Sequence, residues 1–153
     1  MPLDPPPRAD RPDRDSPSLT SIGFLLHLAQ SRLREGVVAA IAGSGLHPAQ
    51  LGILGALADR GGMSQRRLSE LTHIEKSSMV IFLDGLEAGD WVARTPDPDD
   101  RRAHLVQLTR EGAGRFGQLG PPLLAAQQRF LEPLTDEETG LFTELLTRLA
   151  RAG

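Results

Sequence analysis

The sequence contains no cysteine, and this absence excludes several classes of protein. Without thiols there are no disulfides, no thiolate metal sites and no cysteine-based redox sensor. The 153 residues also lack an apolar run long enough to cross a bilayer. The N-terminus, rich in Asp and Pro, lacks the basic start and apolar stretch of a signal peptide. We therefore expect a cytoplasmic protein with no membrane partner.

Positive charge is also scarce. The formal net charge is −3 at pH 7, and Lys76 is the only lysine. Between residues 61 and 102 the acidic residues outnumber the basic ones. A protein that binds nucleic acid without sequence preference is usually basic. Any DNA-binding surface in this chain must therefore place its positive charge locally.

The first 17 residues are mainly Pro, Asp and Arg. Such a segment cannot bury enough apolar surface to offset the entropy of ordering, so we predict a disordered tail. Residues 18–153 are predicted to form a single domain. Helical spacing of apolar residues predicts one amphipathic helix over residues 18–43. Its apolar positions are Ile22, Leu25, Leu26, Ala29, Leu33, Val37 and Ile41.

Three further helices are predicted in the middle of the chain. One covers residues 48–60, with Pro48 in its first turn. The buried stripe assigned to it is Leu51, Leu54 and Leu57. Two shorter helices follow, one after the N-cap Ser64 and one over residues 76–88, joined by about four residues. This arrangement is typical of a helix-turn-helix.

The second short helix is followed by a predicted β-hairpin, which would form a wing. The helical period of the apolar residues ends here, so residues 91–94 and 103–108 are predicted as strands, and residues 95–100 between them are rich in turn formers. Thr109 is predicted to cap a helix that continues towards Leu131 but must bend or break at Gly120, Pro121 and Pro122. A capping box at Thr135 opens the last helix. The fold predicted is mainly α with a small β-wing.

Five short segments resemble the MarR family of regulators. They are residues 46–51 (LHPAQL), 64–69 (SQRRLS), 74–79 (IEKSSM), 86–94 (LEAGDWVAR) and 97–103 (DPDDRRA), the last followed by LTREG at residues 108–112. The resemblance implies a winged helix-turn-helix over about residues 47–108. It also implies a homodimer built from the helices at 18–43 and 110–151, and a pseudo-palindromic operator in duplex DNA. A repressor that responds to a small aromatic or phenolic acid is the implied function. The sequence has no metal-ligand spacing and no Gly-rich phosphate loop after a strand, so we expect neither enzymatic activity nor a cofactor.

The predicted DNA-binding residues follow from the way a helix enters the major groove. The N-terminal residues of such a helix reach base edges, and its free N–H groups bind phosphate. Arg101 at the wing tip is predicted to enter the minor groove. By resemblance, Asp100 and Arg102 pair to hold the wing. The full set of DNA candidates is Gln65, Arg66, Lys76, Ser77, Ser78, Val80, Ile81, Arg94, Arg101 and Arg102.

Simpler interpretations of these residues remain open. Ser77 and Ser78 could merely cap or solvate the first helical turn, and Arg101 could be a solvated turn residue. Arg94 either reaches phosphate or pairs with acidic residues of the wing. His73 stands at a turn position where the family often has glycine, and histidine tolerates a positive φ better than most residues.

The predicted recognition helix departs from the family at three positions. Val80 and Ile81 stand where relatives usually have Thr and Arg, and Gly85 replaces a basic residue. The inward face assigned to Met79, Phe82, Leu83 and Leu86 turns both β-branched residues outward. They could contact thymine methyl groups. Alternatively, the chain is a winged-helix protein-interaction module with weakened or lost operator reading.

A ligand site is predicted on the first helix. His27, Gln30, Ser31 and Arg34 are spaced to lie together, and His47 is a further candidate. Histidine and arginine suit an anionic aromatic acid. The alternatives are a solvated helix face or intersubunit salt bridges, and for His47 an N-cap before Pro48. The four histidines have no metal-ligand spacing, so we expect no metal site.

Overall fold

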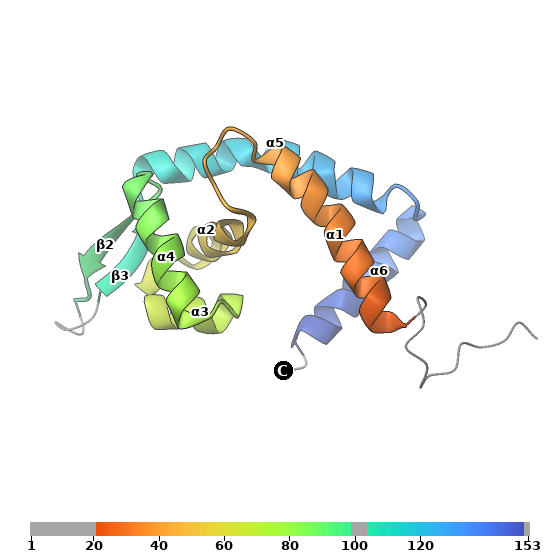
Figure 1. Cartoon of the computed structure of the whole chain (residues 1–153), viewed down its shortest axis with the longest axis horizontal. Coiled ribbons are helices and arrows are strands. Elements are labelled where there is room, and N and C mark those ends of the chain that lie inside the picture. Colours follow the sequence, from red (N-terminus) through yellow and green to blue (C-terminus); the bar gives the residue numbers. More distant parts are fainter. Residues whose placement is uncertain (1–20, 99–103, 152–153) are drawn as a thin grey trace, which may run out of the picture.

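The computed structural model describes residues 21–98 and 104–151. Figure 1 shows a lobe at one end, formed by α2, α3, α4 and a small sheet, while α1 and α6 lie at the other end. The long helix α5 joins the two ends. In chain order the elements are α1 (Ile22–Ala40), α2 (Pro48–Arg60), β1 (Met63–Ser64), α3 (Gln65–Thr72), α4 (Lys76–Ala88), β2 (Val92–Pro96), β3 (His104–Leu108), α5 (Arg110–Leu131) and α6 (Asp136–Arg151).

Side-chain caps explain where several helices begin. The Ser64 hydroxyl accepts a hydrogen bond from the Arg67 N–H at 3.2 Å, which starts α3 as predicted. The Thr109 hydroxyl accepts from the Gly112 N–H at 2.8 Å and starts α5. Thr135 and Glu138 form the predicted capping box before α6.

The sheet has three antiparallel strands in the order β1-β3-β2. The pair β2 and β3 is the predicted hairpin, in which Arg94 faces Val106 across the ladder. Strand β1 was not predicted, because two residues are too few to show the alternation by which a strand is recognised. The predicted wing residues Asp100, Arg101 and Arg102 lie outside the described residues.

The core of the lobe lies between its three helices and the sheet. The predicted inward face of α4 is confirmed for Met79, Leu83 and Leu86, which are fully buried. The stripe predicted for α2 needs one correction, since Leu51 is only half-buried and Ile53 is fully buried. The remaining buried apolar residues of this core are Leu54, Leu57, Met63, Leu68, Trp91, Val92 and Val106.

Helix α5 runs without a break through Pro121 and Pro122. Figure 1 shows that it arches over the molecule, so the predicted continuation holds, with bending in place of a break. It packs against α1, where a Cβ on Gly36 would lie 3.3 Å from the Ala126 Cβ. Within the described ranges, no helix combines the length and apolar character needed to cross a membrane.

Candidate nucleic-acid interface

The turn between α3 and α4 sets the direction of the second helix. His73 ends α3 with φ 54° and ψ 24°, the left-handed conformation expected for this position. Helix α4 then begins after Glu75, whose side chain makes no capping hydrogen bond. The first N–H groups of α4 therefore lack a side-chain cap and suit a phosphate oxygen. Lys76 and Ser77 are exposed at this end, and Ser78 is half-buried.

One face of α4 is exposed and partly apolar. Val80 is 42% exposed and Ile81 is 70% exposed, as the helical periodicity predicts. Ser77 and Asp84 are also exposed on this helix. This chain covers these two side chains only in part, so their exposed apolar surface is available to the methyl groups of bases or to another apolar surface.

The cations of α3 are held by one carboxylate. Arg66 Nε lies 3.0 Å from Glu70 Oε1, and Arg67 Nη1 lies 3.3 Å from Glu70 Oε2. Hydrogen bonds from Arg66 and then Arg67 lower the pKa of Glu70. Because ion pairs exposed to solvent contribute little to stability, either arginine can exchange the carboxylate for a phosphate at small cost. Gln65, also predicted to contact DNA, occupies the first turn of α3.

Arg94 on β2 ties the wing to α4. Its guanidinium donates to Asp84 Oδ1 at 2.6 Å and to Glu87 Oε2. The hydrogen bond to Asp84 is the largest cause of a raised pKa for Arg94, ahead of that to Glu87. From the sequence, Arg94 was expected to reach phosphate or to pair with acids of the wing, whereas both observed partners belong to α4. Arg94 thus compensates two carboxylates beside the exposed face of α4.

Gly85 has a packing role that the sequence analysis did not foresee. A Cβ at this position would lie 3.3 Å from Nε2 of Gln50, which donates a hydrogen bond to the Phe82 carbonyl at 3.0 Å.

His47 caps α2 through Nδ1, which accepts from the Ala49 N–H at 3.2 Å, so its predicted alternative as an N-cap is confirmed. The His47 ring also stacks on Phe82, with centroids 5.2 Å apart.

A groove of about 380 Å³ lies between α1 and the start of α2. Three of the five predicted ligand residues line it, namely Gln30, Arg34 and His47. His27 and Ser31 do not line it, although both are exposed on α1. Leu33, Val37, Pro48 and Ala49 supply its apolar surface. A guanidinium and an imidazole beside an apolar wall suit a planar acid.

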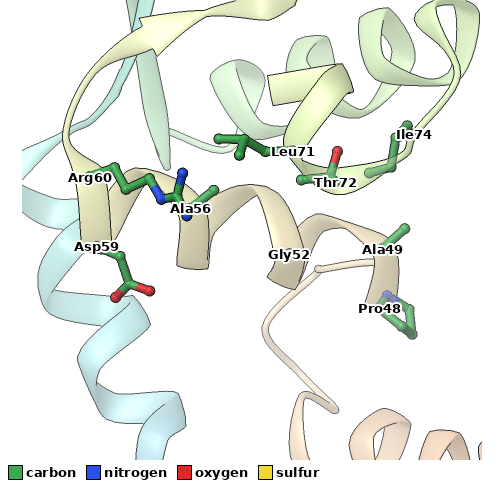
Figure 2. Close-up of a pocket in the computed structure, with 9 residues that line it drawn as sticks. All are labelled: Pro48, Ala49, Gly52, Ala56, Asp59, Arg60, Leu71, Thr72 and Ile74. Atoms are coloured by element: carbon green, nitrogen blue, oxygen red, sulfur yellow. The ribbon is translucent and has the colours of Figure 1, made fainter. Parts of the chain in front are cut away.

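A second groove, of about 490 Å³, lies between α2 and the end of α3 (Figure 2). The sequence analysis did not predict it. Small residues of α2 form one side, and the only charged side chains lining it are Asp59 and Arg60. Pro48 and Ala49 line both grooves, so the first turn of α2 separates them. The other lining residues are Gly52, Ala56, Leu71, Thr72 and Ile74.

Comparison with known proteins agrees with this geometry. A family model described as the MarR family matches residues 44–103. The transcriptional regulator HosA of Escherichia coli O111:H- is 31% identical over 103 residues, covering 67% of this chain and 76% of HosA. A similar solved structure is that of Bordetella bronchiseptica BpsR, whose DNA binding is regulated by 6-hydroxynicotinic acid. The two structures match with a TM-score of 0.81 and 28% sequence identity, over 88% of this chain and 96% of BpsR.

A further solved structure holds DNA. It is the transcriptional repressor CouR bound to a 23-mer duplex, with a TM-score of 0.79 and 28% identity, covering 85% of this chain and 92% of CouR. This chain belongs to the MarR family of winged helix-turn-helix transcriptional regulators, which are DNA-binding proteins without enzymatic activity.

Proposed function

We propose that this regulator is a homodimeric repressor that binds a pseudo-palindromic operator. Its affinity for that operator would change when a small aromatic acid binds to the protein. The start of α4 would enter the major groove, and Arg101 of the wing the adjacent minor groove. The proposed contacts are Gln65, Arg66, Lys76, Ser77, Ser78, Val80, Ile81, Arg101 and Arg102, with Asp100 and Arg102 holding the wing. Arg94, the remaining candidate, would support DNA binding through its ion pairs with Asp84 and Glu87.

The observation that carries the DNA proposal is the uncapped and exposed start of α4. Lys76 and Ser77 stand there with no side-chain cap occupying the first N–H groups. Arg66 on α3 holds an exposed carboxylate that a phosphate can replace. The CouR complex with duplex DNA supports the same use of the fold.

The dimer proposal rests on apolar faces outside the lobe. No residue of α1 or α6 is buried in the single chain. Ile22 on α1 is 77% exposed and Leu149 on α6 is 71% exposed, with further leucines beside them. Exposed apolar faces of this kind are typical of subunit interfaces. Helices α1, α5 and α6 would therefore form the dimerisation part of a single domain over residues 18–153.

The ligand proposal rests on the groove between α1 and α2. Arg34 and His47 are the groups that would hold a carboxylate there, and Gln30 would contact a ring substituent. The regulation of BpsR by 6-hydroxynicotinic acid supports an aromatic acid as the ligand class. His27 and Ser31 keep a role in this proposal only if the partner subunit completes the site.

The DNA proposal is tested with fluorescence anisotropy on duplexes tiled across the region upstream of the protein's own gene. We expect one duplex to be retained at low salt, with an affinity that falls steeply as salt rises. Lys76→Ala should reduce the slope of log K against log salt by about one unit, because it removes one phosphate contact. Arg151→Ala, which removes a cation at the end of α6, is the matched control.

If no duplex is preferred and Lys76→Ala changes nothing, the protein-interaction module is the better description. The exposed Val80 and Ile81 would then be the surface that contacts the partner protein.

A further inference from the structure

Gln50 is the only buried polar residue among those the structure describes, at 7% exposed. Both ends of its amide are used. Its Oε1 accepts from the His47 N–H at 2.8 Å, and its Nε2 donates to the Phe82 carbonyl at 3.0 Å. A buried polar group that loses its partner bears the full cost of desolvation. The two bonds therefore fix the first turn of α2 against the middle of α4.

A second contact joins the same two places. The His47 ring stacks on Phe82 with an interplanar angle of 19°. Gly85, one turn further along α4, leaves the space in which the Gln50 amide lies. Glycine inside a helix costs about 1 kcal/mol relative to alanine, and here this cost permits the approach of Gln50.

The residues that hold α4 also border the groove between α1 and α2. His47 lines the groove and is bonded to Gln50, while Gln50 itself does not line it. His47 Nδ1 accepts a hydrogen bond from the Ala49 N–H, and the same ring stacks on Phe82. A ligand that accepts from the Ala49 N–H in place of Nδ1, or that rotates the imidazole, must therefore disturb the stack. The groove and the DNA-reading helix thus share one set of contacts.

We propose that Gln50 is a positioning residue which, with His47 and Phe82, couples occupancy of the α1–α2 groove to the position of α4. The inference rests on the proposed function, in that it assigns to this groove the ligand that regulates DNA binding. Coupling of this kind needs an element that has two arrangements and that both sites bias. The first turn of α2 is placed to be that element, because it borders the groove on one side and is bonded to α4 on the other.

The first test uses the protein alone. Gln50→Met keeps the length of the side chain and removes both hydrogen bonds. We expect hydrogen exchange to quicken about tenfold for the amides of α4, because only one of the two lost hydrogen bonds reaches this helix. Exchange in α6 should change little. Ser44→Ala is the matched control, since it removes a side chain that bonds only to the backbone of Ile41 and Leu46, just before α2, among the hydrogen bonds of the described residues.

His47→Asn guards against a Gln50 variant that fails to fold. Asparagine still caps a helix, so this change removes the stack on Phe82 and leaves the cap. It should quicken exchange in α4 several-fold, by less than Gln50→Met. Exchange in α4 that stays at the Ser44→Ala level in both variants overturns the proposal.

The second test adds 6-hydroxynicotinate as the probe and measures the dissociation constant of the retained duplex with and without it. In the wild type the probe should change the constant several-fold or more, as coupled sites do. Gln50→Met should bind the probe equally well by calorimetry, yet lose most of that change. A full probe effect in Gln50→Met overturns the coupling. If the wild type does not bind the probe, the ligand class proposed above fails and so does the coupling to this groove, whereas the packing of Gln50 against α4 is still decided by the exchange experiment.

Discussion

At the scale of single residues, Arg94 resolves a difficulty in the charge of this protein. The segment proposed to meet DNA has more acidic than basic residues. Two of those acids, Asp84 and Glu87, are bonded to Arg94, whose side chain is only 26% exposed. The guanidinium cancels carboxylate charge that would otherwise repel phosphate beside the exposed face of α4. The resemblance to other regulators includes an arginine at position 94, but it does not predict that this arginine pairs with Asp84 and Glu87.

Replacing Arg94 with glutamine should weaken operator binding about tenfold or less, because a partly exposed ion pair is worth about 1 kcal/mol. The double variant Arg94→Gln with Asp84→Asn should recover much of the loss, measured as a dissociation constant at fixed salt. Recovery is the mark of compensation. If the double variant binds as weakly as Arg94→Gln alone, Arg94 contacts phosphate directly, as the sequence analysis first allowed.

At the scale of elements, the start of α5 is fixed on the junction between α4 and β2. A Cβ on Gly112 would lie 2.0 Å from the Trp91 carbonyl oxygen, which no side chain can tolerate without movement of the backbone. Arg115 lies over the Trp91 ring at 4.0 Å and donates to the Gly89 carbonyl at 2.6 Å. The Thr109 hydroxyl donates to the Asp90 carbonyl at 2.7 Å. The lobe and the long helix are thereby held at one angle.

Gly112→Ala should lower the free energy of unfolding by about 1–3 kcal/mol, the usual cost of overpacking. Gly114→Ala lies in the same helix with open space at its Cβ and should instead stabilise by about 0.5–1 kcal/mol. Urea unfolding at one protein concentration compares the two, since subunit association would otherwise shift the midpoint. Equal stabilities for the two variants would mean that the contact with Trp91 is not kept in solution.

The elements that could be predicted from the sequence are those with a local signal. Helix starts could be predicted at Ser64, Thr109 and Thr135, because a capping side chain bonds to the backbone within three residues. The link from Gln50 to Phe82 spans 32 residues and leaves no periodic trace. Only some of the predicted ligand residues line the groove, because the spacing along α1 groups His27 with Arg34 but does not say which of them faces α2. The partners of Arg94 likewise depend on the angle between wing and helix.

At the scale of the whole molecule, the chain divides its apolar surface between two uses. The lobe encloses its own core, whereas α1 and α6 leave theirs uncovered. Figure 1 places both helices away from the lobe, towards the other end of α5. A second copy joined there would carry a second lobe, and two lobes on one duplex bind far more tightly than one. The uncovered surface and the scarcity of positive charge are therefore connected, because weak half-sites need a dimer.

Leu141→Glu tests this connection, because Leu141 is 56% exposed on α6 and its loss leaves the single chain intact. Placing a carboxylate in an apolar interface costs several kcal/mol unless it is paired. We expect light scattering to give the mass of one chain in place of two, and operator affinity to fall by about 100-fold or more as avidity is lost. Thr147→Glu adds the same charge to another exposed position of α6 and should change neither quantity. A Leu141→Glu protein that keeps both its mass and its affinity would place the subunit interface away from α6, and the apolar face of this helix would then need another partner.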